Sequence, residues 1–222
     1  MTELNIFEKL VFIMKKSILL YFLLHSFFLV AQTDYSDTWE DFYSYNNVKD
    51  IVKVDQTIYA LTDNAVFIYD SNSKEVEKLS SVHGLSGETT TAIYYNKSLE
   101  KLVIGYENGL IEVVDADKVI NVAADIVNFN QAGSKSINHI EAFGTKLYLS
   151  TPFAIVVYDL EKLEYGDTYF IGANSTSIEI NETTILNETI YAATENGIYS
   201  ASLSEPNLVD AANWEITSAG TT

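Results

Sequence analysis

The amino-acid sequence predicts an all-β protein, a β-propeller with about four blades of four antiparallel strands each. Three observations support this fold class. A hairpin motif recurs four times, its copies lie 43 to 45 residues apart, and the composition favours strands. Repeats of this length with four strands in each are typical of propeller blades.

The hairpin motif is clearest in its second copy, where the apolar runs Leu102–Tyr106 and Leu110–Val114 flank Asn108 and Gly109. An Asn-Gly pair between two such runs is the strongest local signal of a β-hairpin. The corresponding positions are Asn64 in the first copy, Phe153 in the third, and Asn196 with Gly197 in the fourth.

An aspartate recurs where the second strand of a hairpin ends, at Asp70, Asp115 and Asp159. Aspartate accepts hydrogen bonds from nearby backbone amides and so favours turns. Recurrence at the spacing of the repeat therefore predicts a turn-capping role. We expect the hairpin residues and these aspartates to form a structural repeat motif.

Strand propensity supports the same fold. The chain has 15 tyrosines, 11 phenylalanines and only two prolines, and aromatic residues are enriched in strands. Beyond the amino-terminal segment, no stretch has helical periodicity longer than two turns. A β-sandwich is the alternative architecture, but it does not explain a hairpin repeated four times.

The chain begins with a segment that we expect to be removed by processing. Two lysines precede a short apolar run that ends at Ala31, and Gln32 follows. This order is typical of a secretory signal peptide, so we expect residues 1–31 to be a signal with cleavage near Ala31/Gln32. Residues 1–13 resemble an extension ahead of a start at Met14. A retained amino-terminal anchor is the alternative, although the run is shorter than the about 20 apolar residues of a membrane span.

Residues 32–222 are then expected to form a partial propeller. Its predicted repeats are 48–87, 88–129, 135–174 and 175–216. Within the second repeat the predicted strands are Thr91–Tyr95, Lys101–Tyr106, Leu110–Asp115 and Val119–Ala123.

Both ends of this region carry a tryptophan segment placed like an outermost strand, 39–42 and 214–216. If four blades closed the ring, these two segments would compete for one position. We therefore expect the amino-terminal strand to complete a later blade, and the chain to be the amino-terminal piece of a longer protein with a larger ring.

Charge and composition exclude several partners and site types. The formal net charge is −18, from 31 acidic residues and 13 basic residues that are all lysine. A chain this acidic, without arginine, is unsuited to nucleic acid, and it would avoid an anionic membrane surface. The absence of cysteine excludes disulfides, thiolate zinc sites and a cysteine nucleophile.

No catalytic or cofactor-binding arrangement can be assembled from the remaining residues. The histidines of the predicted propeller, His83 and His139, lack the spacing of metal ligands. No serine lies in a Gly-x-Ser-x-Gly motif and no phosphate-binding loop is present. We expect neither an enzyme nor a cofactor. Seven tyrosines are expected mostly to pack between blades, with a minority available for binding: Tyr94, Tyr95, Tyr106, Tyr148, Tyr158, Tyr165 and Tyr169.

The segment Val82–Gly87, followed by a strand and by Leu102–Gly109, resembles the repeats called two-component regulator propellers. Further segments look like the amino-terminal propeller of PorZ, a component of the type IX secretion system of Bacteroidetes. These segments are 39–45, 154–159, 167–172 and 190–197, and the resemblance covers essentially all of 32–216.

This resemblance implies an exported, non-enzymatic protein in the periplasm or on the outer-membrane surface of a Gram-negative bacterium. Its implied role is a binding or scaffold propeller in the attachment complex that delivers anionic lipopolysaccharide to a sortase-like component. The implied partners are other proteins of that complex and anionic polysaccharide, without a membrane span after signal removal. The alternative function is the periplasmic ligand-sensing propeller of a hybrid two-component regulator. A propeller enzyme ranks third.

Overall fold

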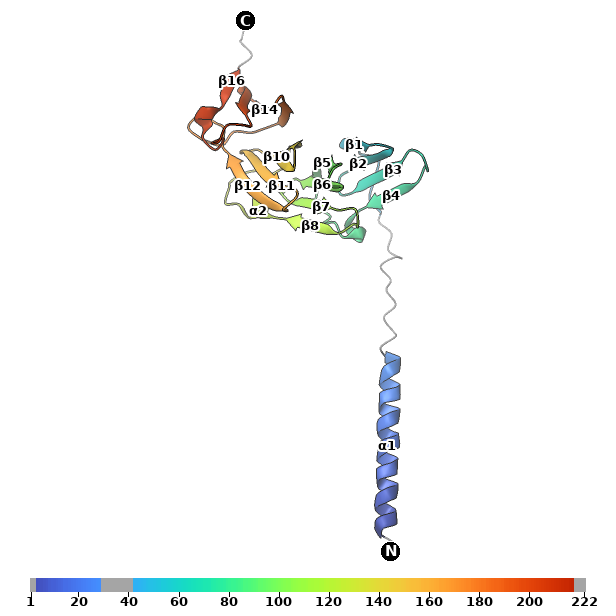
Figure 1. Cartoon of the computed structure of the whole chain (residues 1–222). Helices are drawn as coiled ribbons and strands as arrows, with labels where there is room; N and C mark the ends of the chain where they lie inside the picture. The colour runs from blue at the N-terminus through green and yellow to red at the C-terminus, as the bar shows by residue number, and fades with distance from the viewer. Residues whose placement is uncertain (1–2, 29–41, 218–222) are drawn as a thin grey trace. The chain divides into compact units, whose positions relative to one another are not determined.

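The computed structural model describes residues 3–28 and 42–217, which belong to two compact units, Met1–Glu40 and Asp41–Thr222 (Figure 1). The predicted cleavage site near Ala31/Gln32 and most of the amino-terminal tryptophan segment lie outside the described residues.

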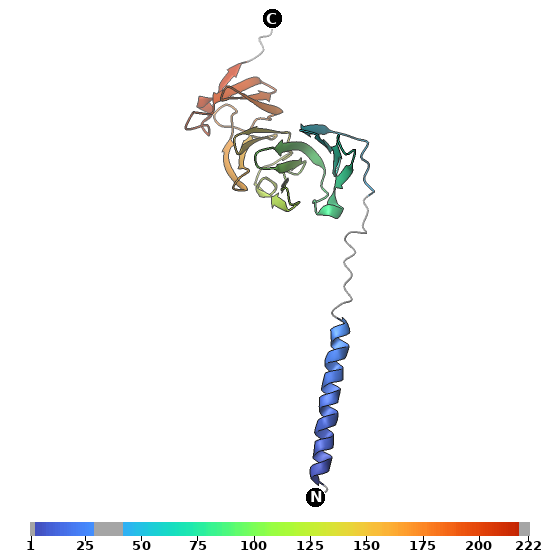
Figure 2. The same cartoon turned by 45° about the vertical axis from the view of Figure 1, so that its right-hand side comes forward.

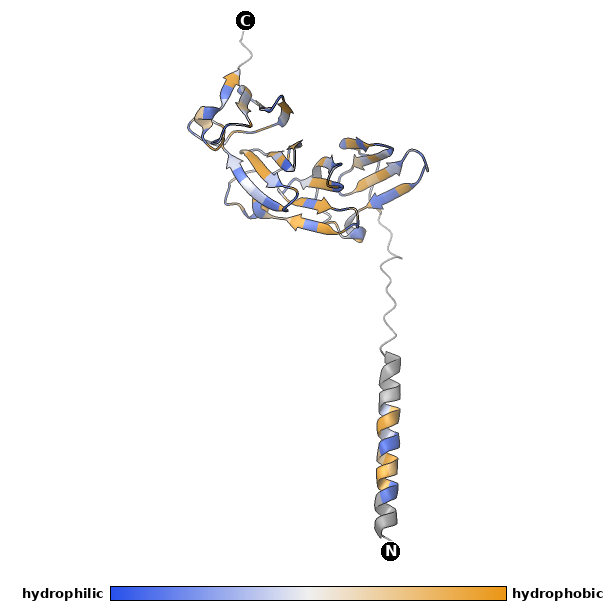
Figure 3. Ribbon diagram, viewed as in Figure 1, coloured by the Kyte–Doolittle hydropathy of each residue, from blue (hydrophilic) through white to orange (hydrophobic). Residues whose placement is uncertain are grey.

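The first unit contains one helix, α1 (Glu3–Phe28), of 26 residues. Hydrophilic positions interrupt the apolar ones along its described part (Figure 3), and Lys16 places its ammonium 4.5 Å from the centre of the Phe12 ring. Across the residues that the structure describes, no helix combines the length and the apolar character needed to cross a membrane.

The second unit consists of four sheets, each of four sequential antiparallel strands, and this confirms the predicted β-propeller blades. Blade 1 contains β1 (Asp50–Val54), β2 (Thr57–Leu61), β3 (Val66–Asp70) and β4 (Val76–Leu79). Blade 2 contains β5 (Thr90–Asn96), β6 (Lys101–Tyr106), β7 (Ile111–Val114) and β8 (Ile120–Ala123).

Blade 3 contains β9 (His139–Phe143), β10 (Lys146–Ser150), β11 (Ile155–Asp159) and β12 (Glu164–Tyr169). Blade 4 contains β13 (Glu182–Leu186), β14 (Thr189–Thr194), β15 (Gly197–Ser202) and β16 (Glu215–Thr217). The remaining described helices of this unit are short connections: η2 (Ser81–His83), α2 (Asp125–Asn128) and η3 (Ala211–Asn213).

The first strand of each blade lies beside the first strand of the next, so that β1 neighbours β5, β5 neighbours β9, and β9 neighbours β13 (Figure 2). This is the radial arrangement of a propeller, in which successive sheets face one another. The segment predicted as the outer strand of the fourth repeat is the outermost strand there, because β16 pairs with β15.

Each interface between neighbouring blades is filled by its own cluster of buried apolar side chains. Blades 1 and 2 bury a cluster that includes Leu61, Val66, Leu79, Ile93, Ile104 and Val114. Blades 2 and 3 bury one that includes Val103, Ile111, Val113, Leu147, Leu149 and Tyr158. Blades 3 and 4 bury one that includes Tyr148, Ile155, Tyr169, Ile190, Ala192 and Trp214. Alternating residues of a strand therefore enter different cores, as the period of two in a strand requires.

Candidate functional site

The recurring hairpin turns connect the second and third strands of each blade. In blade 1 the Thr62 amide donates to the Ala65 carbonyl at 2.9 Å and closes the turn. The side-chain amide of Asn64 donates to the Gly87 carbonyl at 3.0 Å. This asparagine therefore ties its hairpin to the loop that leads into blade 2.

The second hairpin uses its Asn-Gly pair locally. The side-chain oxygen of Asn108 accepts from the Leu110 amide at 3.0 Å. Gly109 has φ +89°, and a Cβ there would lie 2.5 Å from Ile126 Cγ2 and 2.9 Å from the Lys135 carbonyl. Only glycine fits this left-handed and crowded position.

The segment entering the next blade donates a backbone hydrogen bond to the preceding hairpin in three successive cases. The donors and acceptors are Thr90 to Asp63 at 2.9 Å, Ile137 to Tyr106 at 3.1 Å, and Ile180 to Thr151 at 3.0 Å. In the third hairpin the Phe153 carbonyl also accepts from the Ile178 amide at 3.3 Å. These turns therefore connect neighbouring blades through backbone hydrogen bonds.

The fourth hairpin is held by the Thr194 side chain, which donates to the Gly197 carbonyl at 2.9 Å and accepts from the Asn196 amide at 3.2 Å. Gly197 has φ +129°. Within residues 42–217 this turn receives no backbone hydrogen bond from a following segment.

The three recurring aspartates accept backbone hydrogen bonds in the turns that follow their strands. Asp70 Oδ1 accepts from the amides of residues 72 and 73, both at 2.8 Å. Asp115 Oδ1 accepts from 117 and 119, at 3.0 and 2.9 Å. Asp159 Oδ1 accepts from 161 and 162, at 3.1 and 3.0 Å. Backbone donors lower the pKa of Asp70 and Asp159, because they favour the charged form.

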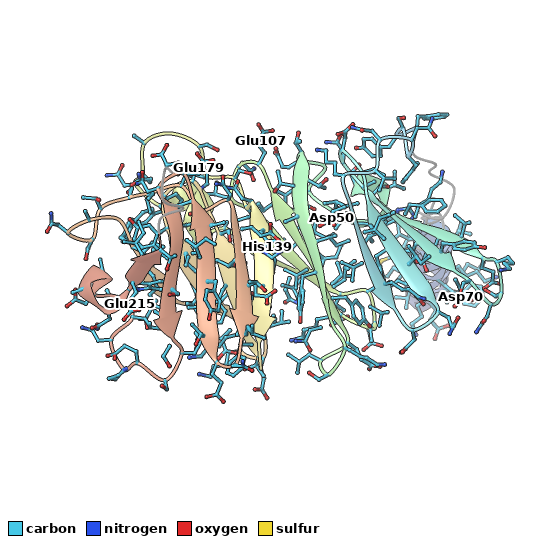
Figure 4. All side chains as sticks on the ribbon, turned by 90° about the horizontal axis from the view of Figure 1, so that it is seen from above. Asp50, Asp70, Glu107, His139, Glu179 and Glu215 are labelled. Carbon is cyan, nitrogen blue, oxygen red and sulfur yellow. The ribbon has the colours of Figure 1, made fainter. Side chains whose placement is uncertain are left out.

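In each blade the hairpin joins the second and third strands, and the aspartate lies in the turn after the third strand. The hairpins and the aspartates therefore lie at opposite ends of the blades. In Figure 4, Glu107 of the second hairpin lies at the upper edge of the view, and Asp70 lies lower, at its right-hand side. The structural repeat motif is therefore spread over the propeller and does not converge on one site.

A buried carboxylate, Glu112 on β7, was not anticipated from the sequence. It is 1% exposed, and one oxygen accepts from the Ser86 amide at 2.9 Å. Its other oxygen accepts from the hydroxyl of Tyr106, which is fully buried. Burial raises the pKa of Glu112 and of Tyr106. The only sequence signal was a glutamate within an otherwise apolar strand.

A cavity of about 680 Å³ lies between blades 1 and 2, at the end where the aspartate-capped turns lie. Tyr59 and Tyr95 form part of its lining with stacked rings, 5.1 Å between centroids and 24° between planes. Burial raises the pKa of Tyr59 to about 12, and Tyr95 adds to the shift. The apolar part of the wall is Ile68, Val76, Leu79, Leu102, Val114 and Ala116.

Five carboxylates and one ammonium also line this cavity. The carboxylates are Asp70, Glu75, Glu77, Glu100 and Asp115, and the ammonium is that of Lys118. The formal charge of the lining is therefore −4. Lys118 is paired with Glu77 across the two blades, whereas no ion pair or hydrogen bond is made by the Glu100 side chain to another described residue.

The two histidines of the propeller, His83 and His139, lie in separate parts of the fold. His83 lies within hydrogen-bond distance of the Ser80 hydroxyl, 3.1 Å from its Nδ1, and His139 is on β9. In the described part of the chain, no three His, Cys, Asp or Glu side chains come together as metal ligands. Of the seven tyrosines, four are buried between blades, and these are Tyr106, Tyr148, Tyr158 and Tyr169.

Comparison with solved structures places this fold among known propellers. PorZ of Porphyromonas gingivalis matches with a TM-score of 0.70 and 19% identity, over 81% of this chain and 24% of that chain. Saccharomyces cerevisiae Sqt1 matches with a TM-score of 0.59 and 12% identity, over 80% of this chain and 50% of that chain. The WD40 repeats of RRP9 match with a TM-score of 0.55 and 12% identity, over 71% of this chain and 48% of that chain. At these identities the likeness shows the fold alone.

The chain spans about a quarter of the PorZ structure that it matches. No curated protein matches the sequence. The match to a family, in contrast, is extensive, because residues 58–215 fit the family described as the type IX secretion system PorZ amino-terminal β-propeller domain. These residues include most of blade 1 and all strands of blades 2 and 3. The chain therefore belongs to the PorZ amino-terminal β-propeller family of type IX secretion system components.

Proposed function

We propose that this propeller is a non-enzymatic binding and scaffold domain in the cell-surface attachment complex of a type IX secretion system. In this proposal the complex delivers anionic lipopolysaccharide to its sortase-like component, and the propeller holds partner proteins in place. The single observation that carries the proposal is the family match over residues 58–215. The protein would act after export, in the periplasm or on the outer-membrane surface.

The charge of the chain supports protein contacts for this propeller. A formal net charge of −18 repels anionic polysaccharide at close range. We therefore assign the polysaccharide to the complex as a whole and the scaffold contacts to this propeller. The side chains of Asn64 and Asn108 and the three recurring aspartates are engaged in internal hydrogen bonds, which supports a structural use of the repeat motif.

The test is an in-frame deletion of the gene in its bacterial host, with complementation by the wild-type gene as the control. The expected result is that cargo proteins lose their surface attachment and accumulate in the medium without lipopolysaccharide. Unchanged surface attachment would contradict the proposal. A transmembrane helix followed by a histidine-kinase region, encoded beyond Thr222, would instead support the sensor alternative.

A further inference from the structure

The cavity between blades 1 and 2 has the form of a binding site. Its volume of about 680 Å³ lies within the range of small-ligand pockets, about 300–1,000 Å³. It combines an apolar wall, a stacked tyrosine pair and charged groups at the margin. Because β2, β3 and β4 contribute one side and β5, β6 and β7 the other, the site is held by two rigid sheets.

The charge of the lining selects a cation. Five carboxylates face one lysine there, and this lysine already has Glu77 as its partner. Asp70 and Asp115 use one carboxylate oxygen each in their turns. Glu100 is exposed and makes no ion pair with a described residue. The net negative charge of the lining would repel an anionic ligand.

The spacing of the carboxylates favours an extended cation over a metal ion. Among the described residues, no three acidic side chains approach one another as metal ligands, so a point charge would not be enclosed. A peptide with several basic side chains can reach separate carboxylates. Arginine also stacks on aromatic rings, and the face of a tyrosine ring attracts a cation.

We propose that the cavity between blades 1 and 2 binds a basic peptide segment of a partner protein. One arginine or lysine side chain lies against the Tyr59–Tyr95 pair, and neighbouring basic side chains face Glu75, Glu100 and the turn aspartates. The proposal names the chemistry of the partner that the scaffold would bind. It rests on the proposed scaffold function, because that function is the reason to take the ligand to be a protein. Peptide binding by the purified chain can nevertheless fail while the role in secretion stands.

The direct test is fluorescence anisotropy with the purified full chain and a labelled octapeptide of alternating arginine and glycine. The same peptide with citrulline in place of arginine keeps the shape and removes the charge. The expected result is saturable binding of the arginine peptide that weakens with salt, and at least about tenfold weaker binding of the citrulline peptide. Equal binding of both peptides would overturn the proposal.

Two substitutions with opposite expected effects distinguish peptide binding in the cavity from non-specific attraction to the acidic surface of the chain. Glu100→Gln removes an uncompensated rim charge and should weaken binding by about three- to tenfold. Lys118→Gln removes the one cation of the rim and should tighten binding by about two- to fivefold.

Glu188→Gln is the matched control, because Glu188 precedes β14 of blade 4 as Glu100 precedes β6 of blade 2. Both are exposed and both have left-handed backbones, with φ 59° and 51°. Peptide affinity should be unchanged in this variant. Equal effects of Glu100→Gln and Glu188→Gln would show diffuse attraction to the acidic surface and would overturn the proposal, as would unchanged or weaker binding by Lys118→Gln.

Discussion

The hydroxyl of Tyr106 donates a hydrogen bond to the carboxylate of Glu112, and both side chains are buried between the first two blades. The second carboxylate oxygen accepts from the Ser86 amide at 2.9 Å. Hydrogen bonding to Ser86 thus joins the Gly84-Leu85-Ser86 turn to β7, while Leu85 is buried in the adjacent core. A buried carboxylate requires such partners, because an unpaired one is costly.

Glu112 should make stability depend on pH. Burial raises its pKa above the ordinary 4.5, against the opposing hydrogen bonds from Tyr106 and Ser86. The folded protein therefore holds this proton more tightly than the unfolded chain. Its contribution to stability is complete below the ordinary pKa and is lost as pH rises through the folded-state pKa. The variant Glu112→Gln lacks this titration.

The measurement is urea unfolding of the wild type and Glu112→Gln over a pH series. The free energy of unfolding of the variant should rise relative to that of the wild type as pH increases. A constant difference between the two proteins would contradict the assigned pKa shift. The comparison removes the effects of the other acidic groups, which both proteins share.

Asp159 should give a pH dependence of the opposite sign. A hydrogen bond from the Lys162 amide is the largest cause that lowers its pKa below 3.8. Its stabilising contribution is therefore present above the ordinary pKa and is lost as pH falls through the folded-state pKa. In Asp159→Asn the loss of stability should be measurable at neutral pH and should vanish in acid. Asp167→Asn is the control on the neighbouring strand, because no hydrogen bond to another described side chain or backbone group is made by the Asp167 carboxylate.

The sequence predicts the parts of this fold that depend on local contacts. Asn108 and Gly109 form their turn through bonds within five residues, so the period of the hairpins located all four blades. The strands predicted in the second repeat agree with β5 to β8 to within one residue at each end. The same contacts explain why the turn residues recur without forming a common site.

The cavity could not be predicted in the same way, because its parts are brought together only by packing. Tyr59 and Tyr95 are 36 residues apart and stack only once blades 1 and 2 pair. Nothing in the sequence separates Tyr95, which lines the cavity, from Tyr106, which is buried in the same interface. Glu112 likewise meets the Ser86 amide 26 residues away.

Gly109 should be far less tolerant of substitution than a second glycine of similar backbone conformation. Gly109→Ala combines a left-handed residue with a Cβ placed 2.5 Å from Ile126, and we expect a loss of about 2–4 kcal/mol in the free energy of unfolding. Gly133 has φ +93° with no atom within 4 Å of an added Cβ. Gly133→Ala should therefore cost only about 1 kcal/mol. Equal losses in urea unfolding would contradict the crowding seen at Gly109.

Asn64 should contribute to stability through its hydrogen bond to the loop that leads from blade 1 into blade 2. Its side chain donates to the Gly87 carbonyl at 3.0 Å, whereas the side chain of Asn196 makes no comparable bond to a described residue. Asn64→Ala should lower the free energy of unfolding by about 1 kcal/mol, because the carbonyl loses its partner. Asn196→Ala, at the equivalent hairpin position of blade 4, should change it by less than about 0.5 kcal/mol. A larger loss at Asn196 than at Asn64, measured under identical conditions, would mean that the side chain is used within the turn rather than between blades.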